Sequence, residues 1–138
     1  MTLRIVRLGS PRHLEEGLRI GTVRRPPRGV PKREYARRDL YDVWLPNLAP
    51  SEALVKEART SLDDGDDASW RRFVRRYRAE MKTLESRALL DTLAALSHHA
   101  NFSIGCYCAD EARCHRSVLR ELLAERGAKM VAAPVRGE

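Results

Sequence analysis

Residues 101–133 read NFSIGCYCADEARCHRSVLRELLAERGAKMVAA, and their pattern decides the fold. Asn101–Cys106 is a short apolar run, which is typical of a buried strand. After a loop, Ser117–Arg126 carries apolar residues at helical spacing, and Gly127 follows as a helix-ending residue. Lys129–Ala133 is then expected to form a final strand. A strand, a helix and a strand in this order predict a parallel crossover.

The rest of the chain supplies further strands and helices. The expected strands are Leu3–Leu8, Leu18–Val23 and the shorter Tyr41–Leu45. One helix begins after the cap residue Ser51, and another begins at Ser86. The helix between them has one apolar face made of Trp70, Phe73, Val74, Tyr77, Met81 and Leu84. We therefore predict a single α/β domain with a mainly parallel sheet of about four strands flanked by helices. It spans residues 1–133, and residues 134–138 form a frayed tail.

Composition narrows the classes of protein to consider. The chain has 138 residues, of which 33% are charged and 43% hydrophobic, as in a globular domain. No stretch approaches the roughly 20 apolar residues of a membrane span, so no membrane association is expected. The first residues lack the apolar core of a signal peptide, which favours a cytoplasmic location. In a reducing compartment the three cysteines are thiols or metal ligands. The net charge of +7 favours anionic partners.

One loop gathers most of the reactive side chains. All three cysteines lie within nine positions, next to His115 and Arg116. In a parallel sheet, such a loop at the end of a strand faces the crevice where ligands bind. The N-terminus of the following helix stabilises anions, including a thiolate. We therefore expect a lowered pKa for Cys114, supported by Arg113 and Arg116.

Several chemistries fit this loop, and the sequence leaves them open. Cys114 is a candidate nucleophile, with His115 as its acid, base or orienting group. Alternatively, Cys108 and Cys114 form a redox pair across the turn. A third possibility is a structural zinc site made of Cys106, Cys108, Cys114 and His115. The simplest interpretation of Cys106 is a small buried apolar residue. From the sequence we assign neither a metal nor a cofactor.

A second basic segment, Arg24–Arg33, contains three prolines and one glycine, so it forms a loop. Arginines in a surface turn are commonly just solvated. Arg24, Arg28 and Lys32 also suit a clamp for a phosphate or carboxylate, because arginine offers two parallel donors. If the strands before this loop and before the cysteine loop are parallel, both loops emerge at the same edge. Arg116 and Ser117 would then complete the anion site.

A third basic feature is the Arg71–Arg78 stripe on the middle helix. It is either a solvated helix face paired with neighbouring acids or a surface for nucleic acid. No aromatic side chains interleave on this polar face, so base stacking is not supported. The sequence gives no indication of oligomeric state.

Several separated motifs resemble the YeaO-like family, also called domain of unknown function 488. Trp44–Ser51 reads WLPNLAPS and Phe73–Met81 reads FVRRYRAEM, which resemble W-x3-L-A-P-S and F-x2-R-Y-x2-E stretches of that family. Arg24–Lys32 is similar to its D-R-L-W-P-R-G-x2-K stretch, and Cys114–Leu119 is similar to a C-H-R-x2-L ending. Val23 stands where the family has an acidic residue.

The resemblance implies a small α/β domain and no settled activity. The positions that match family motifs are Arg24, Arg28, Trp44, Ser51, Arg76, Tyr77, Glu80 and His115.

These observations lead to one functional hypothesis with two alternatives. We expect a thiol-dependent enzyme that acts on a small anionic or phosphorylated ligand. Its catalytic residues would be Cys114 as the thiolate, Cys108 as a second thiol and His115. The residues expected to bind the anion are Arg24, Arg28, Arg116 and Ser117. The alternatives are a basic module that binds nucleic acid and a structural zinc site in the Cys106–His115 loop.

Overall fold

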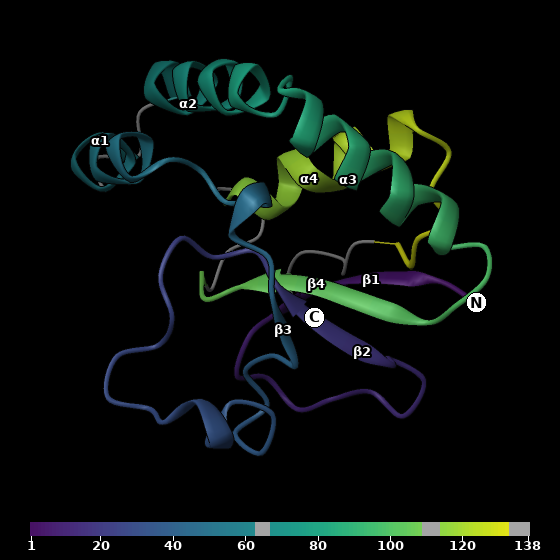
Figure 1. The fold of residues 1–138 in the computed structure, drawn as a ribbon. Coiled ribbons are helices and arrows are strands. Elements are labelled where there is room, and N and C mark those ends of the chain that lie inside the picture. Colours follow the sequence, from purple (N-terminus) through teal and green to yellow (C-terminus); the bar gives the residue numbers. More distant parts are fainter. Residues whose placement is uncertain (63–66, 109–113, 133–138) are drawn as a thin grey trace.

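The computed structural model describes residues 1–62, 67–108 and 114–132 (Figure 1). Within them, the chain forms a four-stranded parallel sheet with the strand order β1-β4-β2-β3. The strands are β1 (Leu3–Arg7), β2 (Leu18–Gly21), β3 (Val43–Trp44) and β4 (Phe102–Cys106). The α-helices are α1 (Glu52–Leu62), α2 (Asp67–Glu80), α3 (Leu84–Leu96) and α4 (His115–Glu125). Two 3-10 turns are η1 (Lys32–Glu34) and η2 (Pro46–Leu48). This arrangement confirms the predicted α/β fold.

Strand β4 lies in the centre of the sheet, and all of its residues are buried. Along β1 the register runs from Leu3 opposite Phe102 to Arg7 opposite Cys106. Gly105 makes this pairing possible, because a Cβ atom there would lie 2.5 Å from the carbonyl oxygen of Val6. The strand therefore carries Cys106 to the carboxyl-terminal edge of the sheet.

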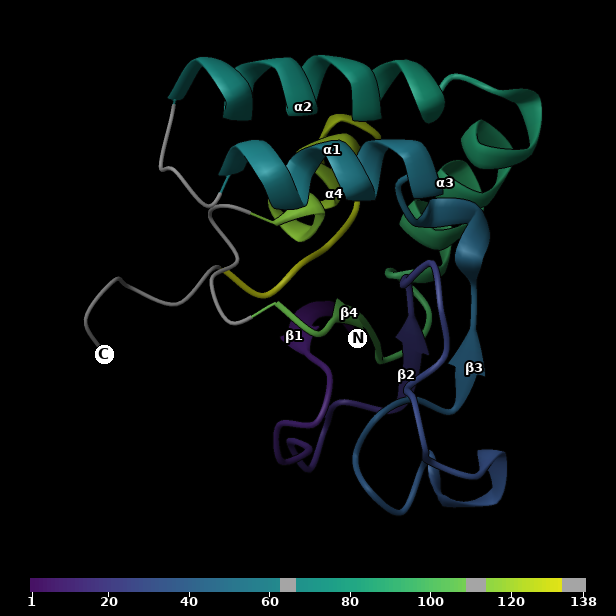
Figure 2. The same ribbon diagram turned by 90° about the vertical axis from the view of Figure 1, so that its left-hand side faces the viewer.

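The four helices lie on one face of the sheet (Figures 1 and 2). Between them and the sheet, Phe102 and Ile104 of β4 join the main hydrophobic core with Tyr77 and Leu119. The predicted apolar face of α2 is largely confirmed, because Phe73, Tyr77 and Met81 are buried and Trp70 and Val74 pack against the core.

Leu84 was wrongly assigned to the apolar face of α2. It is 71% exposed, because α2 ends at Glu80 and Leu84 begins α3. The start of α3 is set by Thr83, whose side-chain oxygen accepts a hydrogen bond from the backbone N–H of Ser86. The prediction therefore placed the start of this helix two residues too late.

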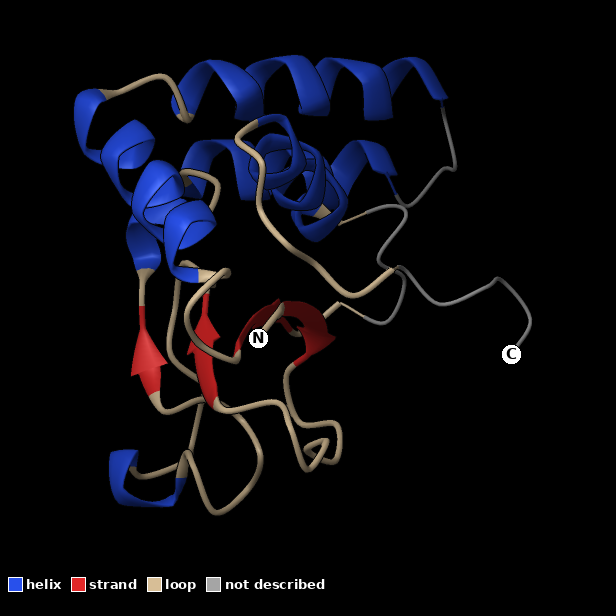
Figure 3. Cartoon of the chain, turned by 90° about the vertical axis from the view of Figure 1, so that its right-hand side faces the viewer, coloured by secondary structure: helices blue, strands red, loops and turns tan. Residues whose placement is uncertain are grey.

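Loops cover the opposite face of the sheet (Figure 3). A fully buried ion pair lies beneath them: Arg19 Nε is 2.7 Å from Glu16 Oε2, and Arg19 Nη2 is 2.8 Å from Glu16 Oε1. The hydroxyl of Ser103 on β4 donates to the same carboxylate at 2.8 Å. This face thus combines a buried ion pair with a smaller apolar cluster that includes Leu8 and Tyr41.

The C-terminal part of the chain partly follows the prediction. Helix α4 begins at His115, two residues earlier than expected, and Gly127 follows it with φ +79°. The strand expected at 129–133 is wrong for the described residues, which extend to 132, because only Met130 forms a bridge, with Leu3. The predicted tail at 134–138 lies outside the described residues. No helix in the described part of the chain is long and apolar enough to cross a membrane.

Candidate thiol site

The candidate site lies where β2 and β4 end and α4 begins. Because β2 and β4 are parallel neighbours, their carboxyl ends meet at the same edge of the sheet. Cys106 is the last residue of β4, Cys114 is the N-cap residue of α4, and His115 is its first residue. The fold therefore joins a strand end and a helix N-terminus, as the sequence predicted.

The basic segment and the cysteines line the same pocket, which has a volume of about 1290 Å³. Residues 23–28 form one wall, and residues 106–108, Cys114 and His115 form another. The beginning of α1 and Phe73 complete the wall. The expectation that the two loops emerge side by side is thus confirmed.

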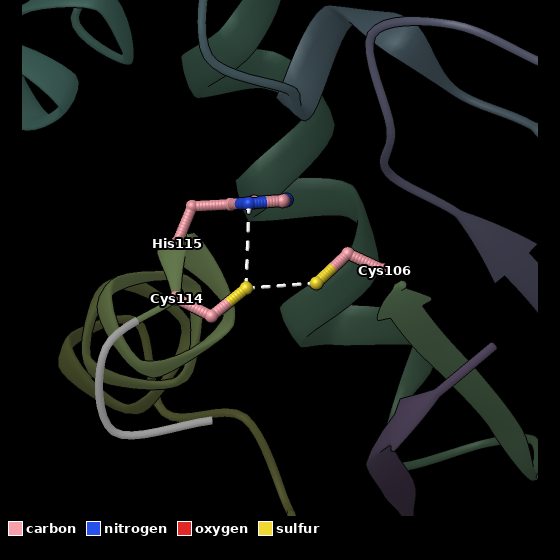
Figure 4. Close-up of side chains that lie close together, drawn as sticks. All are labelled: Cys106, Cys114 and His115. Carbon is pink, nitrogen blue, oxygen red and sulfur yellow. Dashed lines mark hydrogen bonds between the residues drawn. The ribbon is translucent and has the colours of Figure 1, made fainter. Parts of the chain in front are cut away.

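Three buried side chains form a contact chain behind the pocket wall (Figure 4). The sulfur atoms of Cys106 and Cys114 are 2.7 Å apart, and Cys114 Sγ is 3.6 Å from His115 Nδ1. Cys108, in contrast, is exposed. The sequence paired Cys114 with Cys108, but the structure also places Cys106 Sγ in contact with Cys114 Sγ. The reason is that Cys106 ends the buried central strand beside the start of α4, whereas Cys108 has already left the strand.

The orientation of His115 is set by Thr22, the residue that directly follows β2. Its Nε2 atom lies 2.8 Å from the carbonyl oxygen of Thr22. A carbonyl only accepts hydrogen bonds, so Nε2 carries the proton and Nδ1 presents its lone pair to Cys114. The ring also stacks on Tyr77, with centroids 5.6 Å apart. Burial lowers the pKa of His115 to about 4, so the imidazole is neutral near pH 7 and acts as an acceptor that orients Cys114.

The three thiols of the cluster differ in the direction of their pKa shifts. Hydrogen bonds from Cys106 and Cys114 lower the pKa of Cys108, and the charge of Arg116 adds to this effect. A hydrogen bond with Cys106 lowers the pKa of Cys114, but Cys108 and burial outweigh it and raise that pKa to about 11. Hydrogen bonds to Cys108 and Cys114 raise the pKa of Cys106 far above its usual range. The expected lowering of the Cys114 pKa is therefore wrong, and the lowered pKa belongs to Cys108, which is exposed. The catalytic role of Cys108, Cys114 and His115 stays a prediction.

The predicted anion-binding residues divide into different roles. Arg28 is exposed and lines the pocket. Arg24 also lines it, but its Nε and Nη2 atoms donate to the carbonyl groups of Pro46, Ala49 and Pro50. Its guanidinium group therefore braces the chain before α1.

The two predicted residues on α4 also act within the protein. Arg116 is buried and donates from Nη2 to the carbonyl oxygen of Cys108 at 2.6 Å, so it holds the cysteine loop. The Ser117 hydroxyl donates back to the carbonyl oxygen of Cys114 at 2.9 Å. Arg113, expected to support the thiolate, lies outside the described residues. Anion binding by Arg24, Arg116 and Ser117 stays a prediction.

Comparison with protein families decides the identification. Residues 3–127 match a family model described as the active DUF488-N3 subclade. The chain belongs to the DUF488 family. This match confirms the resemblance seen in the sequence motifs. No curated protein and no solved structure matched the chain.

The motif residues of this DUF488 chain brace the walls of the site. Ser51 donates to the Glu80 carboxylate from its backbone N–H, at 2.9 Å, and from its hydroxyl, which links the start of α1 to α2. The indole N–H of Trp44 donates to the carbonyl oxygen of Val23 at 2.7 Å. The hydroxyl of Tyr77 donates to the carbonyl oxygen of Leu48. These motifs therefore position the backbone around the pocket.

The described donor atoms that could hold a metal ion in this DUF488 protein are those of Cys106, Cys114 and His115, which all lie within 4.8 Å of one another. In a tetrahedral zinc site, bond lengths of about 2.3 Å to sulfur and about 2.0 Å to nitrogen separate two sulfur ligands by about 3.8 Å and sulfur from nitrogen by about 3.6 Å. The contact between Cys114 and His115 matches this geometry, whereas the two sulfur atoms are about 1 Å too close. Only the Cys114–His115 pair therefore has the separation that zinc ligands need, and the zinc site stays a prediction.

Sequence reasoning missed one residue of the site and assigned another to the core alone. Thr22 orients His115 through its backbone carbonyl, a group that every residue carries and that no residue type signals. Tyr77 was expected to be mainly a core residue, and it also supports the imidazole ring. Its place in a DUF488 motif was the available signal.

Proposed function

We propose that this DUF488 protein is a thiol-dependent enzyme that acts on a small anionic or phosphorylated ligand, with Cys108 as its nucleophile. The observation that carries the proposal is an exposed thiol of lowered pKa on the wall of a pocket that also bears exposed arginines. The description of the matched subclade as active agrees with an enzymatic role.

The cluster supplies the chemistry of an activated thiol. A thiolate, unlike a thiol, is the attacking species, and a thiol held ionised near neutral pH needs no separate base. The Cys108 sulfur forms a bond to an electrophilic atom of the ligand, and the leaving group departs with its electron pair and takes a proton from solvent. Water or a second ligand then removes the transferred group from sulfur. Cys106 donates a hydrogen bond to the thiolate, and the single S–H proton of Cys114 is shared between the thiolate and His115 Nδ1.

The ligand class follows from the charges at the mouth of the pocket. Arg25 and Arg28 are exposed there, and Arg25 also pairs with Glu52, with 2.9 Å between Nη2 and Oε1. An exposed ion pair of this kind contributes little energy, so an anionic ligand can compete for the guanidinium group. Arg28 is the residue we assign to bind the ligand's anionic group.

The nucleic-acid alternative has less support from the stripe on α2. Arg76 forms an ion pair with Glu57. Arg78 lies 2.8 Å from Glu121 and 3.0 Å from Glu125 of α4. Neighbouring carboxylates therefore neutralise part of this face. Nucleic-acid binding stays a prediction.

A comparison of two alkylating reagents tests the proposal. Iodoacetate is anionic and iodoacetamide is neutral, but both transfer a small carbon group to a thiolate. The measured quantity is the rate with iodoacetate divided by the rate with iodoacetamide at Cys108, resolved by peptide mass spectrometry. We expect this ratio to exceed that of a free cysteine by about tenfold, because the pocket concentrates anions.

Arginine variants show whether the pocket causes this preference. Arg28→Ala should return the ratio toward the free-cysteine value. Arg33→Ala is the matched control, since Arg33 is an exposed arginine of the same segment that is not part of the pocket wall. A ratio equal to that of free cysteine in the unmodified protein, or one unchanged by Arg28→Ala, would contradict the proposal.

A further inference from the structure

The proposed function uses Cys108 as the nucleophile and leaves two thiols, Cys106 and Cys114, which contact each other. Cys106 is 1% exposed and Cys114 is 3% exposed, and both line the pocket. Their sulfur atoms, at 2.7 Å, need to approach by only about 0.7 Å to reach the length of a disulfide bond. A zinc ion instead requires them to separate by about 1 Å. The separation thus lies between the two geometries and nearer to that of a disulfide.

We propose that Cys106 and Cys114 are a redox-active pair that forms a reversible disulfide on reaction with a small-molecule disulfide, which enters through Cys108. The inference rests on the proposed function only in taking Cys108 as the nucleophile.

The backbone holds both cysteines where such a bond needs them. Cys106 is fixed by the pairing of β4 with β1, opposite Arg7. Cys114 is fixed as the N-cap of α4, where its carbonyl oxygen accepts hydrogen bonds from the N–H and the hydroxyl of Ser117. The disulfide therefore joins two ends that the fold has already placed, and little further ordering is required.

The exposed cysteine gives an oxidant access to the buried pair. The Cys108 thiolate attacks one sulfur of the small disulfide, the S–S bond breaks, and the first small thiolate leaves and takes a proton from solvent. Cys114 loses its proton to solvent and attacks Cys108 Sγ, which releases the second small thiolate, and this also takes a proton. Cys106 then loses its proton and attacks Cys114 Sγ, which restores the Cys108 thiolate. Overall, two protein thiols are oxidised and one small disulfide is reduced to two thiols.

Oxidation also changes the nucleophile itself. In the reduced protein, Cys106 and Cys114 donate hydrogen bonds to Cys108. A disulfide has no S–H group to donate, so its formation removes this stabilisation of the thiolate. The pair thus regulates the reactivity of the site through its redox state.

Peptide mapping tests the pair directly. The full-length protein is equilibrated with mixtures of reduced and oxidised glutathione, free thiols are blocked with N-ethylmaleimide, and unreduced peptides are identified by mass spectrometry. Trypsin cleaves after Arg113 and so separates Cys114 from the other two cysteines. We expect a linked Cys106–Cys114 peptide with N-ethylmaleimide on Cys108, and complete reversal with dithiothreitol.

Cysteine variants separate this inference from the proposed function. Cys108→Ser should form the same disulfide more slowly, by about tenfold or more, because the oxidant must reach a buried sulfur. In Cys106→Ser, no internal disulfide that leaves the Cys108 thiol free should form. The disulfide forming while Cys108 shows no enhanced alkylation would overturn the proposed function alone.

Three results would overturn the inference. One is a linkage of Cys114 to Cys108 as the final product, and another is glutathione attached to the cysteines with no internal linkage. The third is a zinc ion, measured at one per chain, that keeps Cys106 and Cys114 reduced under all the mixtures.

Discussion

At the scale of single residues, the site depends on the position of one negative charge among three thiols. Hydrogen bonds to Cys108, together with burial, raise the pKa of Cys106 and Cys114, which favours their protonated forms. Cys108 is exposed, and hydrogen bonds from the other two thiols lower its pKa, which is why we propose it as the thiolate.

The buried, neutral His115 makes stability depend on pH. Its pKa is lowered from 6.5 to about 4 in the folded protein, so only the unfolded chain binds a proton between these values. The free energy of unfolding is therefore fully present above pH 6.5 and should fall by about 3 kcal/mol as the pH is lowered to 4. Urea unfolding between pH 8 and pH 4 measures this loss.

The control for this prediction is His115→Gln, which keeps an N–H donor for the carbonyl oxygen of Thr22 but does not titrate. It should be less stable than the natural protein at pH 8 and show a flatter pH profile down to pH 4. Equal slopes in the two proteins would assign the pH dependence to other groups.

Residue types in the sequence indicated the site but not its internal pairing. The spacing of Cys106, Cys108, Cys114 and His115 predicted one reactive loop, because all four positions adjoin a strand end and a helix start. Which two sulfur atoms touch depends on how far the strand extends before the chain turns. That boundary is set by the pairing of β4 with β1 and β2, which involves residues about a hundred positions away.

At the scale of elements, the site is built from ends of strands and helices, and side chains brace those ends. Arg24 is the clearest brace, since it donates to three carbonyl groups in the segment between β3 and α1. That segment in turn carries Leu48, which accepts the hydrogen bond of the Tyr77 hydroxyl behind His115.

Removing the Arg24 brace should cost stability. We expect Arg24→Ala to lower the free energy of unfolding by about 2 kcal/mol, because three carbonyl groups lose a charged donor. Arg25→Ala is the matched control and should cost less than about 1 kcal/mol, because it removes only an exposed ion pair with Glu52. Urea unfolding of both variants at neutral pH makes the comparison. Equal losses would mean that Arg24 contributes no more than a surface charge.

Elements with strong local signals were predicted well, and those defined by pairing were not. Helix α4 has four buried apolar residues at helical spacing and a glycine after its end, so its existence followed from the sequence. Residues 129–132 look like a strand by composition, yet they pair with β1 only at Met130. Whether an apolar segment joins a sheet depends on the space left at the edge, which local sequence does not contain.

At the scale of the whole molecule, both faces of the sheet bury apolar side chains, and the loop face also buries an ion pair. The helices bury apolar side chains on one face, and loops bury the Glu16–Arg19 ion pair on the other (Figures 1 and 3). A buried ion pair is costly to break, because the remaining partner is left charged without compensation.

The ion pair predicts a second pH effect, at lower pH than that of His115. Burial raises the pKa of Glu16, but hydrogen bonds from Arg19 and Ser103 outweigh it and lower the pKa below the usual 4.5. Its contribution is therefore present above pH 4.5 and is lost as the pH falls through the lowered value. Glu16→Gln should cost about 3 kcal/mol or more at pH 7 and reduce the further loss in acid.

Glu15→Gln is the control for this prediction, since Glu15 is the exposed neighbour of Glu16. It should leave both the stability at pH 7 and the acid profile nearly unchanged. Similar behaviour of the two variants in urea unfolding from pH 7 to pH 2 would contradict the assigned role of the pair.

The pH dependence of alkylation at each cysteine tests most directly whether Cys108 carries the thiolate. The reduced protein is treated briefly with iodoacetamide over a range of pH, and the labelled fraction of each cysteine is measured by peptide mass spectrometry. We predict that Cys108 reaches its half-maximal rate far below about 8.5, the ordinary pKa of a thiol, while Cys106 and Cys114 react only above that value. Half-maximal labelling of Cys114 at a lower pH than that of Cys108, or of all three cysteines near about 8.5, would contradict the assignment of the thiolate to Cys108.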